Sequence, residues 1–527
     1  MIDNLKSQIG QMVVVRACGH LFDHQILYPA WEAPNQKLKY WLQDWNVGGV
    51  ILLGGGVGDL ALRTQQLQSW AKTPLFIAAD IEEGVGQRFP GATWFPPPMA
   101  CGAIALKDPA LGEEYAYQMG AITAKEALAL GINWILAPVM DVNNNSANPV
   151  INVRAFGETP EVVGNLGTAF IRGTKEYPVL STAKHFPGHG DTSTDSHLHL
   201  PSIPHDHSRL NQVEIPPFQK AIAAGVDSVM SAHLLIPAWD AKLPATISPK
   251  ILTEQLRQKL GFDGLIVTDA LIMGGVAKFA TPEEIAVMAV LAGADILLMP
   301  DDPEVAIEAV FKAVQTGKIP LERIESSLKK IAFAKEKIAF STQDITSELD
   351  NPQAQEVAKN IVKDSLITGG PLPVSTTNLS KNSKPLNLII LDNALDCDFL
   401  ARHTPGITIP QQLGYQLQLI DSCSPSLEFD EEREILIQIF VRGNPFRGTA
   451  ELSNSRQSLI KNLLKRKKIT ALLMYGSPYL WKWLKPHLSK DIPWIFSYGQ
   501  MPLAQETIFE ALFNSIDVTN SRQGAFI

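Results

Sequence analysis

The 527-residue sequence predicts an α/β protein, with an N-terminal (β/α)8 TIM barrel and a C-terminal doubly wound α/β sandwich domain. Eight short runs in the first 300 residues are mostly apolar throughout, which is typical of parallel strands buried on both faces. Segments with 3.6-residue periodicity separate these runs, and several end at a glycine, as helices often do. An open doubly wound sheet is the structural alternative, but eight regular units favour the barrel.

The expected barrel strands cover residues 11–17, 48–53, 75–80, 133–142, 180–185, 228–234, 264–269 and 295–299. Helical patterns between them include 113–130, 213–224, 248–260 and 282–292. Beyond the barrel, four more apolar runs at 386–391, 435–440, 470–475 and 494–498 alternate with helical segments such as 455–465 and 503–513. The polar, proline-broken stretch 371–385 indicates a linker. We therefore expect a barrel over 1–340, a helical segment and linker over 341–385, and an α/β domain over 386–527.

The composition narrows the class of protein. Hydrophobic residues make up 45% of the chain, which is enough for packed cores and excludes an intrinsically disordered protein. The net charge of -9 disfavours binding to nucleic acid or to anionic membranes, because both would repel the chain. Four scattered cysteines are too few for a disulfide scaffold, and none lies in a CxxC pair. We expect an acidic globular enzyme, and the sequence leaves its oligomeric state open.

Neither a targeting segment nor a membrane span is predicted. The first apolar run, residues 12–15, is too short for the core of a signal peptide. No stretch reaches 18 apolar residues without a charge, so a transmembrane helix is not expected. The cytoplasm is therefore the expected location.

Ionisable residues gather where the predicted barrel strands end. In a barrel, the chemistry takes place at the carboxyl ends of the strands. A purely structural barrel has little reason to place a lysine and several carboxylates there, although each could also begin a solvated loop. The strand-end residues are Asp80 with Arg88 after strand three, Asp141 with Arg154 after strand four, Lys184 and His185 at strand five, His233 at strand six and Asp269 at strand seven.

The densest polar segment, residues 181–199, reads STAKHFPGHGDTSTDSHLH and leaves strand five as a glycine-containing loop. Asp195 and His197 are two residues apart, so in a turn the carboxylate can accept a hydrogen bond from the imidazole. Such a carboxylate orients the ring and stabilises its protonated form, which makes His197 a candidate general acid/base. A histidine-rich surface loop without catalytic function is the alternative.

Two H-x-H pairs, His197/His199 and His205/His207, raise the possibility of a metal centre. Metal-dependent amidohydrolases are barrels too, but their H-x-H pair ends the first strand. Here the first strand reads VVVRACG, and the H-x-H pairs follow strand five. We therefore expect neither a catalytic metal nor a cofactor.

KHFPGHGDTSTDSH, residues 184–197, resembles the signature of glycoside hydrolase family 3, in its β-N-acetylglucosaminidase branch, where K-H-F-P-G-H-G is followed by D-S-H. Residues 137–157, 230–240 and 244–276 are similar to the family's fourth, sixth and seventh units. The resemblance covers about residues 10–340, and the second domain fits the two-domain members in layout only. It implies a retaining, exo-acting β-N-acetylglucosaminidase that acts on a small carbohydrate, with substrates from peptidoglycan turnover.

The resemblance also implies roles for individual residues. Asp269 would be the nucleophile, and His197 would be the general acid/base, paired with Asp195. Retaining hydrolysis needs a carboxylate on one face of the anomeric carbon and a proton donor on the other. His189 would shape the loop. The residues expected to hold the sugar's hydroxyls are Asp80, Arg88, Arg154, Lys184 and His185, each of which could instead form ion pairs at the barrel rim.

The loop after strand three departs from the family. It commonly reads D-x-E-G-G-R-V-Q-R, whereas this chain has DIEEGVGQR over residues 80–88. Asp80, Glu82, Gln87 and Arg88 remain, but the double glycine and the first arginine are lost. The family pattern therefore does not predict the path of this loop.

Four other functions remain as alternatives. A β-glucosidase or β-xylosidase of the same family would usually lack the Asp195–His197 pair. A phosphorylase is compatible with a histidine acid/base, which does not repel phosphate as a carboxylate would. A metal-dependent barrel hydrolase and a non-catalytic sugar-binding protein are more remote.

Overall fold

The computed structural model describes residues 2–338, 349–375, 384–394, 397–424, 433–443, 452–465 and 468–513. The described chain divides into two compact units, one up to Gln355 and one from Glu356 onwards. No helix within these described ranges is both long and apolar enough to cross a membrane.

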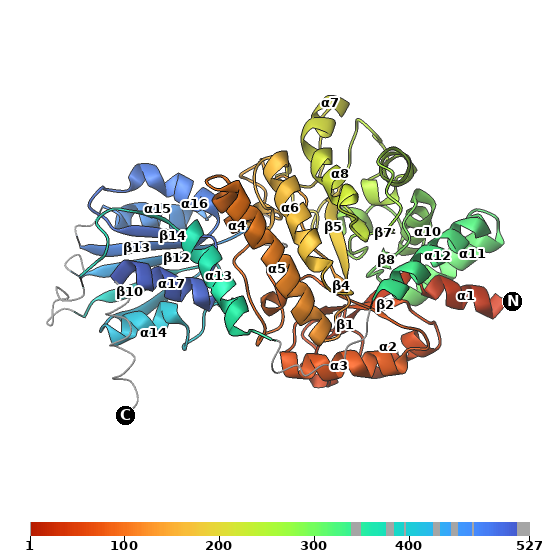
Figure 1. Ribbon diagram of the computed structural model, residues 1–527, viewed down its shortest axis with the longest axis horizontal. Coiled ribbons are helices and arrows are strands. Elements are labelled where there is room, and N and C mark those ends of the chain that lie inside the picture. The colour runs from red at the N-terminus through yellow and green to blue at the C-terminus, as the bar shows by residue number, and fades with distance from the viewer. Residues whose placement is uncertain are drawn as a thin grey trace. The chain divides into compact units, whose positions relative to one another are not determined.

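Eight parallel strands form a barrel in the first unit, in the order β7-β6-β5-β4-β3-β2-β1-β8 (Figure 1). A bridge between Val267 at the end of β7 and Ile296 just before β8 closes the sheet. The predicted (β/α)8 fold is therefore confirmed over the open-sheet alternative. The strands are β1 (Val13–Cys18), β2 (Gly49–Leu53), β3 (Phe76–Ala79), β4 (Trp134–Ile135), β5 (Leu180–Phe186), β6 (Ser228–Ser231), β7 (Leu265–Val267) and β8 (Leu297–Leu298).

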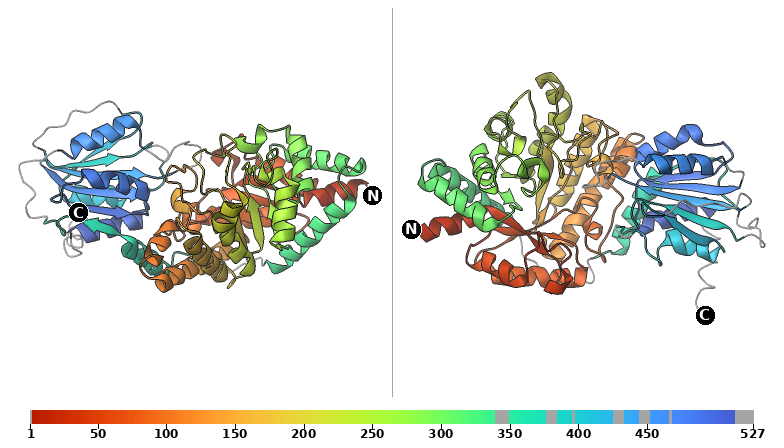
Figure 2. Two further views of the ribbon diagram at one scale, coloured as in Figure 1. Left: turned by 90° about the horizontal axis from the view of Figure 1, so that it is seen from above. Right: turned by 180° about the vertical axis from the view of Figure 1, so that it is seen from behind.

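The strands are short and buried because both of their faces are covered. All six residues of β1 and all seven of β5 are buried. Helices surround the strands in the first unit (Figure 2). The α-helices are α1 (Ile2–Gly10), α2 (Asn35–Gln43), α3 (Val57–Trp70), α4 (Met99–Ala105), α5 (Pro109–Ala129), α6 (Pro160–Thr174), α7 (His207–Arg209), α8 (Ile215–Ala223), α9 (Gly274–Ala277), α10 (Pro282–Ala292), α11 (Pro303–Gln315) and α12 (Leu321–Lys337).

Local sequence signals fix the helix ends. Helix α10 begins with a capping box, in which Thr281 accepts from the Glu284 amide and Glu284 accepts from the Thr281 amide. The chain leaves α10 at Gly293, which has a φ of 121° that favours glycine. The remaining helical turns are the 3-10 turns η1 (Asp23–Gln25), η2 (Val85–Gln87), η3 (Asn152–Arg154) and η5 (Ala245–Ile247), and the π-helical segments η4 (Leu210–Glu214) and η6 (Lys250–Lys259).

The second unit contains a six-stranded mixed sheet in the order β11-β10-β12-β13-β14-β9. All its strand pairs are parallel except that of β14 with β9. Helices α15 and α16 lie on one side of the sheet, and α14 and α17 on the other (Figure 1). The elements are α13 (Pro352–Ser365), β9 (Ile367–Gly369), β10 (Leu386–Ile390), α14 (Pro405–Gln412), β11 (Gln416–Ile420), β12 (Ile435–Val441), α15 (Asn454–Leu463), β13 (Ile469–Gly476), α16 (Pro478–Leu484), η9 (Lys485–His487), β14 (Trp494–Ser497) and α17 (Pro502–Phe513).

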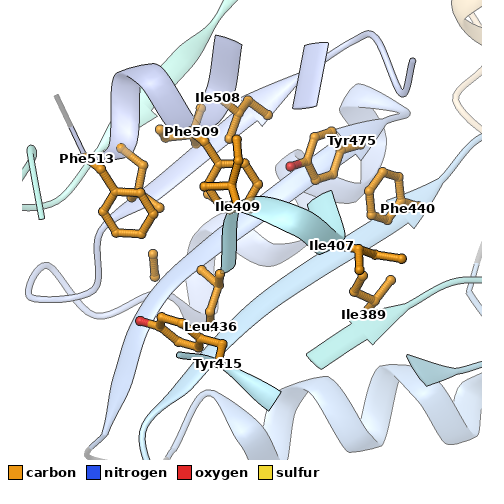
Figure 3. Packing of buried hydrophobic residues seen from close by; sticks show 14 of the residues in the cluster. Ile389, Ile407, Ile409, Tyr415, Leu436, Phe440, Tyr475, Ile508, Phe509 and Phe513 are labelled. Carbon is orange, nitrogen blue, oxygen red and sulfur yellow. The ribbon is translucent and has the colours of Figure 1, made fainter. Parts of the chain in front are cut away.

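Aliphatic and aromatic side chains from the sheet, α14 and α17 form the core on one face of this sheet (Figure 3). The rings of Phe440 and Tyr475 stack with their centroids 4.1 Å apart and their planes 1° from parallel. Such offset or stacked aromatic pairs add about 1 kcal/mol to the burial of their surface. The core includes Leu436 and Phe440 of β12 and Ala471, Leu473 and Tyr475 of β13, which alternate along each strand and so lie on the same face.

The region predicted as a helical segment and linker contains a helix, α13, and also a strand, β9, which was not predicted. Helix α13 crosses the boundary between the two units, and β9 pairs with β14 in an antiparallel edge position. Residues 339–348 and 376–383 of the predicted segment lie outside the described residues. The predicted limits at 340 and 385 therefore remain predictions.

Candidate active site

Two of the predicted sugar-binding residues, Arg154 and Lys184, contact one buried carboxylate, Glu82, and a third, Asp80, joins this network through Lys184. Arg154 donates to it through both Nε and Nη2, at 2.8 and 2.7 Å. The Lys184 ammonium lies 2.6 Å from a Glu82 oxygen and 2.6 Å from an oxygen of Asp80. Glu82 and Lys184 are almost fully buried, whereas the Asp80 side chain is 27% exposed. Asp80 is thus the most exposed member of this network.

The charges of this network stabilise one another. Burial by itself raises the pKa of Glu82, but Arg154 and Lys184 hold it well below its usual value. Burial likewise lowers the pKa of Lys184, and the carboxylates of Asp80 and Glu82 raise it more. Both side chains are therefore ionised at neutral pH. The network presents fixed charges that need no reorganisation when a ligand binds.

The loop after β3 keeps a defined path despite its unusual sequence. Gly84 has a φ of 84°, and a Cβ there would lie 2.6 Å from the Thr93 carbonyl oxygen. Gly86 approaches the Ala92 carbonyl even more closely, at 2.3 Å from the ideal Cβ position. Arg88 ends this turn with an exposed side chain whose Nε donates to the Asp80 carbonyl at 3.2 Å. The loop therefore brings Glu82 into the network and leaves Arg88 at its rim.

His185 is held by a second buried carboxylate, Asp141. The His185 Nδ1 lies 2.7 Å from Asp141 Oδ2, and the same carboxylate accepts the backbone amides of His185 and His189. Burial raises the pKa of Asp141, but the neighbouring histidines lower it overall. An ionised Asp141 fixes the His185 ring with Nδ1 as the donor, so Nε2 remains the other hydrogen-bonding atom of the ring.

The predicted pair of Asp195 and His197 is formed. His197 Nδ1 lies 2.9 Å from Asp195 Oδ1, and the same oxygen accepts the His197 backbone amide at 2.9 Å. The Asp195 carboxylate is 1% exposed and the His197 side chain 17% exposed. With Nδ1 protonated, the ring donates a hydrogen bond from Nδ1 to the Asp195 carboxylate. Nε2 is then the ring atom that can exchange a proton with another group.

His189 supports this pair from inside the loop. Its Nε2 lies 2.8 Å from Ser196 Oγ, and its Nδ1 lies 2.9 Å from Thr192 Oγ1. Burial lowers the pKa of His189 to about 4, so the ring is neutral at pH 7. Ser196 lies between the two members of the pair, which agrees with the loop-shaping role expected of His189.

Asp269 follows β7, and its Oδ1 accepts the amide of Ala270 at 2.8 Å. Burial by itself raises the pKa of the Asp269 carboxyl. The imidazoles of His233, His185 and His197 lower it more than burial raises it, so the net shift is downward. A carboxylate that stays ionised beside three imidazoles is suited to act as a nucleophile.

One group of side chains near the loop has the composition of a metal site. Asp191, His205 and Glu214 offer ligand atoms within 4.8 Å of one another, and it is the one such group among the described residues. However, the Arg209 guanidinium lies 3.2 Å from both carboxylates, and His205 Nε2 lies 2.8 Å from Asp191. An arginine already supplies the positive charge there, so these residues fit an ion-pair cluster better than a cation site.

Comparison with known families identifies two domains in this chain. Residues 4–334 match the glycosyl hydrolase family 3 N-terminal domain, and residues 378–514 match the bacterial glycosyl hydrolase family 3 C-terminal domain. The chain belongs to glycoside hydrolase family 3. A beta-hexosaminidase A from Pseudoalteromonas piscicida is 31% identical to this family 3 chain, over 93% of it and 87% of the relative.

Other members of the family are similar over shorter or equal lengths. A beta-hexosaminidase from Thiobacillus denitrificans is 37% identical over 51% of this chain and 76% of its own. A solved family 3 beta-N-acetylglucosaminidase from Paenibacillus sp. FPU-7 has 29% identity and a TM-score of 0.78, and the match covers 96% of both chains. The family identified by resemblance, the barrel and the assignment as a glycoside hydrolase are therefore confirmed.

Sequence reasoning missed the residues that hold the predicted ones in place. Glu82 and Asp141 were visible as carboxylates in strand-end loops, but nothing in the sequence showed that they pair with Arg154 and His185. His233 was visible at the end of the sixth strand, yet its ring contacts the Thr246 hydroxyl at 2.8 Å through Nδ1 and the Ala270 carbonyl at 3.0 Å through Nε2. Pairings between separate strand ends depend on side-chain geometry, which spacing along the chain does not give.

Proposed function

We propose that this family 3 chain is a retaining exo-β-N-acetylglucosaminidase. The observation that carries the proposal is the hydrogen-bonded pair of Asp195 and His197 on the loop after β5, together with the ionised Asp269 after β7. Relatives similar over most of this chain or of their own length are named beta-hexosaminidase. The family 3 structure from Paenibacillus, similar over 96% of its length, is named a beta-N-acetylglucosaminidase.

The proposed first step forms a covalent glycosyl-enzyme. The Asp269 carboxylate attacks the anomeric carbon, the bond from that carbon to the leaving oxygen breaks, and protonated His197 gives its Nε2 proton to the leaving group. The Asp195 carboxylate stabilises the imidazolium before transfer and keeps the ring oriented afterwards. In the second step neutral His197 takes a proton from water, whose oxygen attacks the same carbon and releases Asp269.

The remaining predicted residues would hold the terminal sugar. Asp80 would accept hydrogen bonds from hydroxyls, and Lys184, Arg154, Arg88 and His185 would donate them. Neutral sugars with many hydroxyls suit a network whose charges are already balanced internally, because no polyanion has to be attracted. Peptidoglycan-derived saccharides with terminal N-acetylglucosamine are the proposed substrates, and the expected cytoplasmic location stays a prediction.

A comparison of aryl glycosides tests the substrate class. We expect hydrolysis of p-nitrophenyl N-acetyl-β-glucosaminide at a higher kcat/KM than the β-glucoside, and a preference for the glucoside would contradict the proposal. A Cellulomonas fimi relative with 28% identity over 63% of this chain is named a beta-N-acetylglucosaminidase/beta-glucosidase. The glucosidase activity is therefore the second candidate.

Trapping tests the nucleophile. A mechanism-based fluorinated substrate analogue should label the peptide that contains Asp269, and the Asp269→Asn variant should not be labelled. Label on another carboxylate would refute the assignment. Product analysis in phosphate buffer distinguishes water from phosphate as the acceptor, because a phosphorylase would release a sugar 1-phosphate.

A further inference from the structure

The loop that carries Asp195 and His197 is joined directly to the segment that follows Asp269. The amide of Gly274 donates to the His197 carbonyl at 3.0 Å, and the amide of Gly275 donates to the Ser196 carbonyl at 3.0 Å. Both amides lie in the first turn of α9, where N–H groups have no acceptor within the helix. The loop carbonyls supply those acceptors.

Both glycines are required by the closeness of this contact. A Cβ on Gly275 would lie 2.7 Å from the Ser196 carbonyl oxygen, and a Cβ on Gly274 would lie 2.8 Å from the Leu198 carbonyl oxygen. Neither glycine has a positive φ, so the backbone conformation itself would accept alanine. The obstructing atoms belong to the main chain of the loop, which cannot rotate away as a side chain can.

The segment that carries the glycines is itself anchored to the barrel. The amides of Leu271 and Ile272 donate to the Leu298 and Met299 carbonyls at the end of β8, at 2.9 and 3.2 Å. Asp269 therefore lies at one end of a short segment, fixed to β7 and β8, whose other end contacts the residues that carry the acid/base pair. Lys278 adds a third contact by donating to the Leu198 carbonyl at 3.1 Å.

We propose that Gly274 and Gly275 are positioning residues that form a seat for the main chain of residues 196–198 and thereby set the place of His197 relative to Asp269. This inference rests on the roles proposed above for those two residues. The seat acts through the loop and touches no substrate atom. Alanine at Gly275 would displace the loop by about 0.7 Å to reach an ordinary 3.4 Å contact. A misplacement of about 1 Å costs roughly 100-fold in rate for positioned catalytic groups.

The test compares substrates that differ in their need for a proton donor. A dinitrophenyl N-acetylglucosaminide has a leaving group that departs without protonation, whereas the sugar released from di-N-acetylchitobiose needs it. For Gly275→Ala we expect kcat/KM on the disaccharide to fall at least tenfold, and kcat/KM on the dinitrophenyl substrate to fall less than threefold. A purely structural defect would lower both alike. His197→Ala is the reference for complete loss of proton transfer.

Gly58→Ala is the matched control, because a Cβ at Gly58 meets nothing within 4 Å and its φ is not positive. It should behave as the unchanged enzyme on both substrates. If Gly275→Ala does not fold, Gly274→Ala tests the same seat, and thermal unfolding identifies folded variants. Equal reductions on the two substrates, or no reduction in a folded variant, would overturn the proposal.

The outcome is separable from the proposed function. If the unchanged enzyme prefers glucosides, the substrate assignment is wrong. The same comparison with dinitrophenyl glucoside and a glucose disaccharide then still tests the seat.

Discussion

Replacing Glu82 with glutamine tests whether this buried carboxylate is the internal counter-ion of the site. The substitution keeps the size of the side chain and removes its charge from between Arg154 and Lys184, which contact it at 2.6 to 2.8 Å. The buried Lys184 and the largely buried Arg154 would then share fewer anions, and the glutamine amide would point a donor at one of them. Breaking a buried ion pair from one side costs about 3–5 kcal/mol. For a unit that extends to Gln355, this cost corresponds to a drop in Tm of roughly 4–7 °C.

Calorimetry of the full chain measures this loss through the barrel's unfolding transition. Glu126→Gln is the matched control, because Glu126 is equally buried but accepts from Thr93 and the Asp350 amide, which are neutral. We expect a cost of about 1–2 kcal/mol there, as for an unsatisfied neutral hydrogen bond. Equal Tm shifts in the two variants, or a shift below about 2 °C for Glu82→Gln, would refute the counter-ion argument.

The acid dependence gives this prediction a second readout. The pKa of Glu82 is held well below its ordinary value of 4.5, so its contribution to stability is present above that value. It is lost as the pH falls through the lower pKa of the folded state. The stability difference between the unchanged protein and Glu82→Gln should therefore shrink on strong acidification. The KM for the sugar substrate should rise at neutral pH, because Lys184 and Arg154 lose their fixed orientation.

Three further predictions concern the loop and the metal question. Asp195→Asn should lower kcat/KM on a disaccharide by about 10²–10³-fold and spare the dinitrophenyl substrate, since proton transfer is what the carboxylate supports; equal effects would contradict this. The pKa of buried His189 falls from 6.5 to about 4 on folding. The free energy of unfolding of the unchanged protein should therefore decrease by about 3 kcal/mol as the pH falls from 6.5 to 4. In the His189→Gln variant, the free energy of unfolding measured by urea titration should lack this dependence on pH. Chelators should leave turnover unchanged, and inactivation reversed by added metal would overturn the ion-pair interpretation of Asp191 and Glu214.

Buried strands were predicted from the sequence more closely than strands at the edge of a sheet. Strands covered on both faces, such as β5 and β12, were predicted almost to the residue, although β5 contains several polar residues and β12 contains Gln438. The edge strand β11 was missed because four of its five residues are exposed or half-buried, so its apolar residues alternate with glutamines. The three-residue β9 was missed for the same reason. An edge strand has one neighbour and needs fewer apolar side chains.

Site residues were predictable from the sequence where their position along the chain determines their position in the fold. Asp269 and Lys184 come at strand ends, and Asp195 lies two residues from its partner, so spacing alone indicated their location. Glu82 and Gly275 could not be assigned in this way. Their importance comes from contacts across separate loops, and for Gly275 from the absence of a side chain. Such contacts appear only when the loops are placed in three dimensions.

The two parts of the site differ in what it costs to move them. Glu82 holds Arg154 and Lys184 through charge-assisted hydrogen bonds inside the barrel rim, at a cost of several kcal/mol to break. The loop of His197 rests on α9 through two backbone hydrogen bonds, each worth about 1 kcal/mol net. Under the proposed roles, the network that would hold the sugar is therefore costly to disturb, whereas the hydrogen bonds between the His197 loop and α9 cost less to break. In the proposed mechanism this lets product depart without disturbing the residues that orient the next substrate.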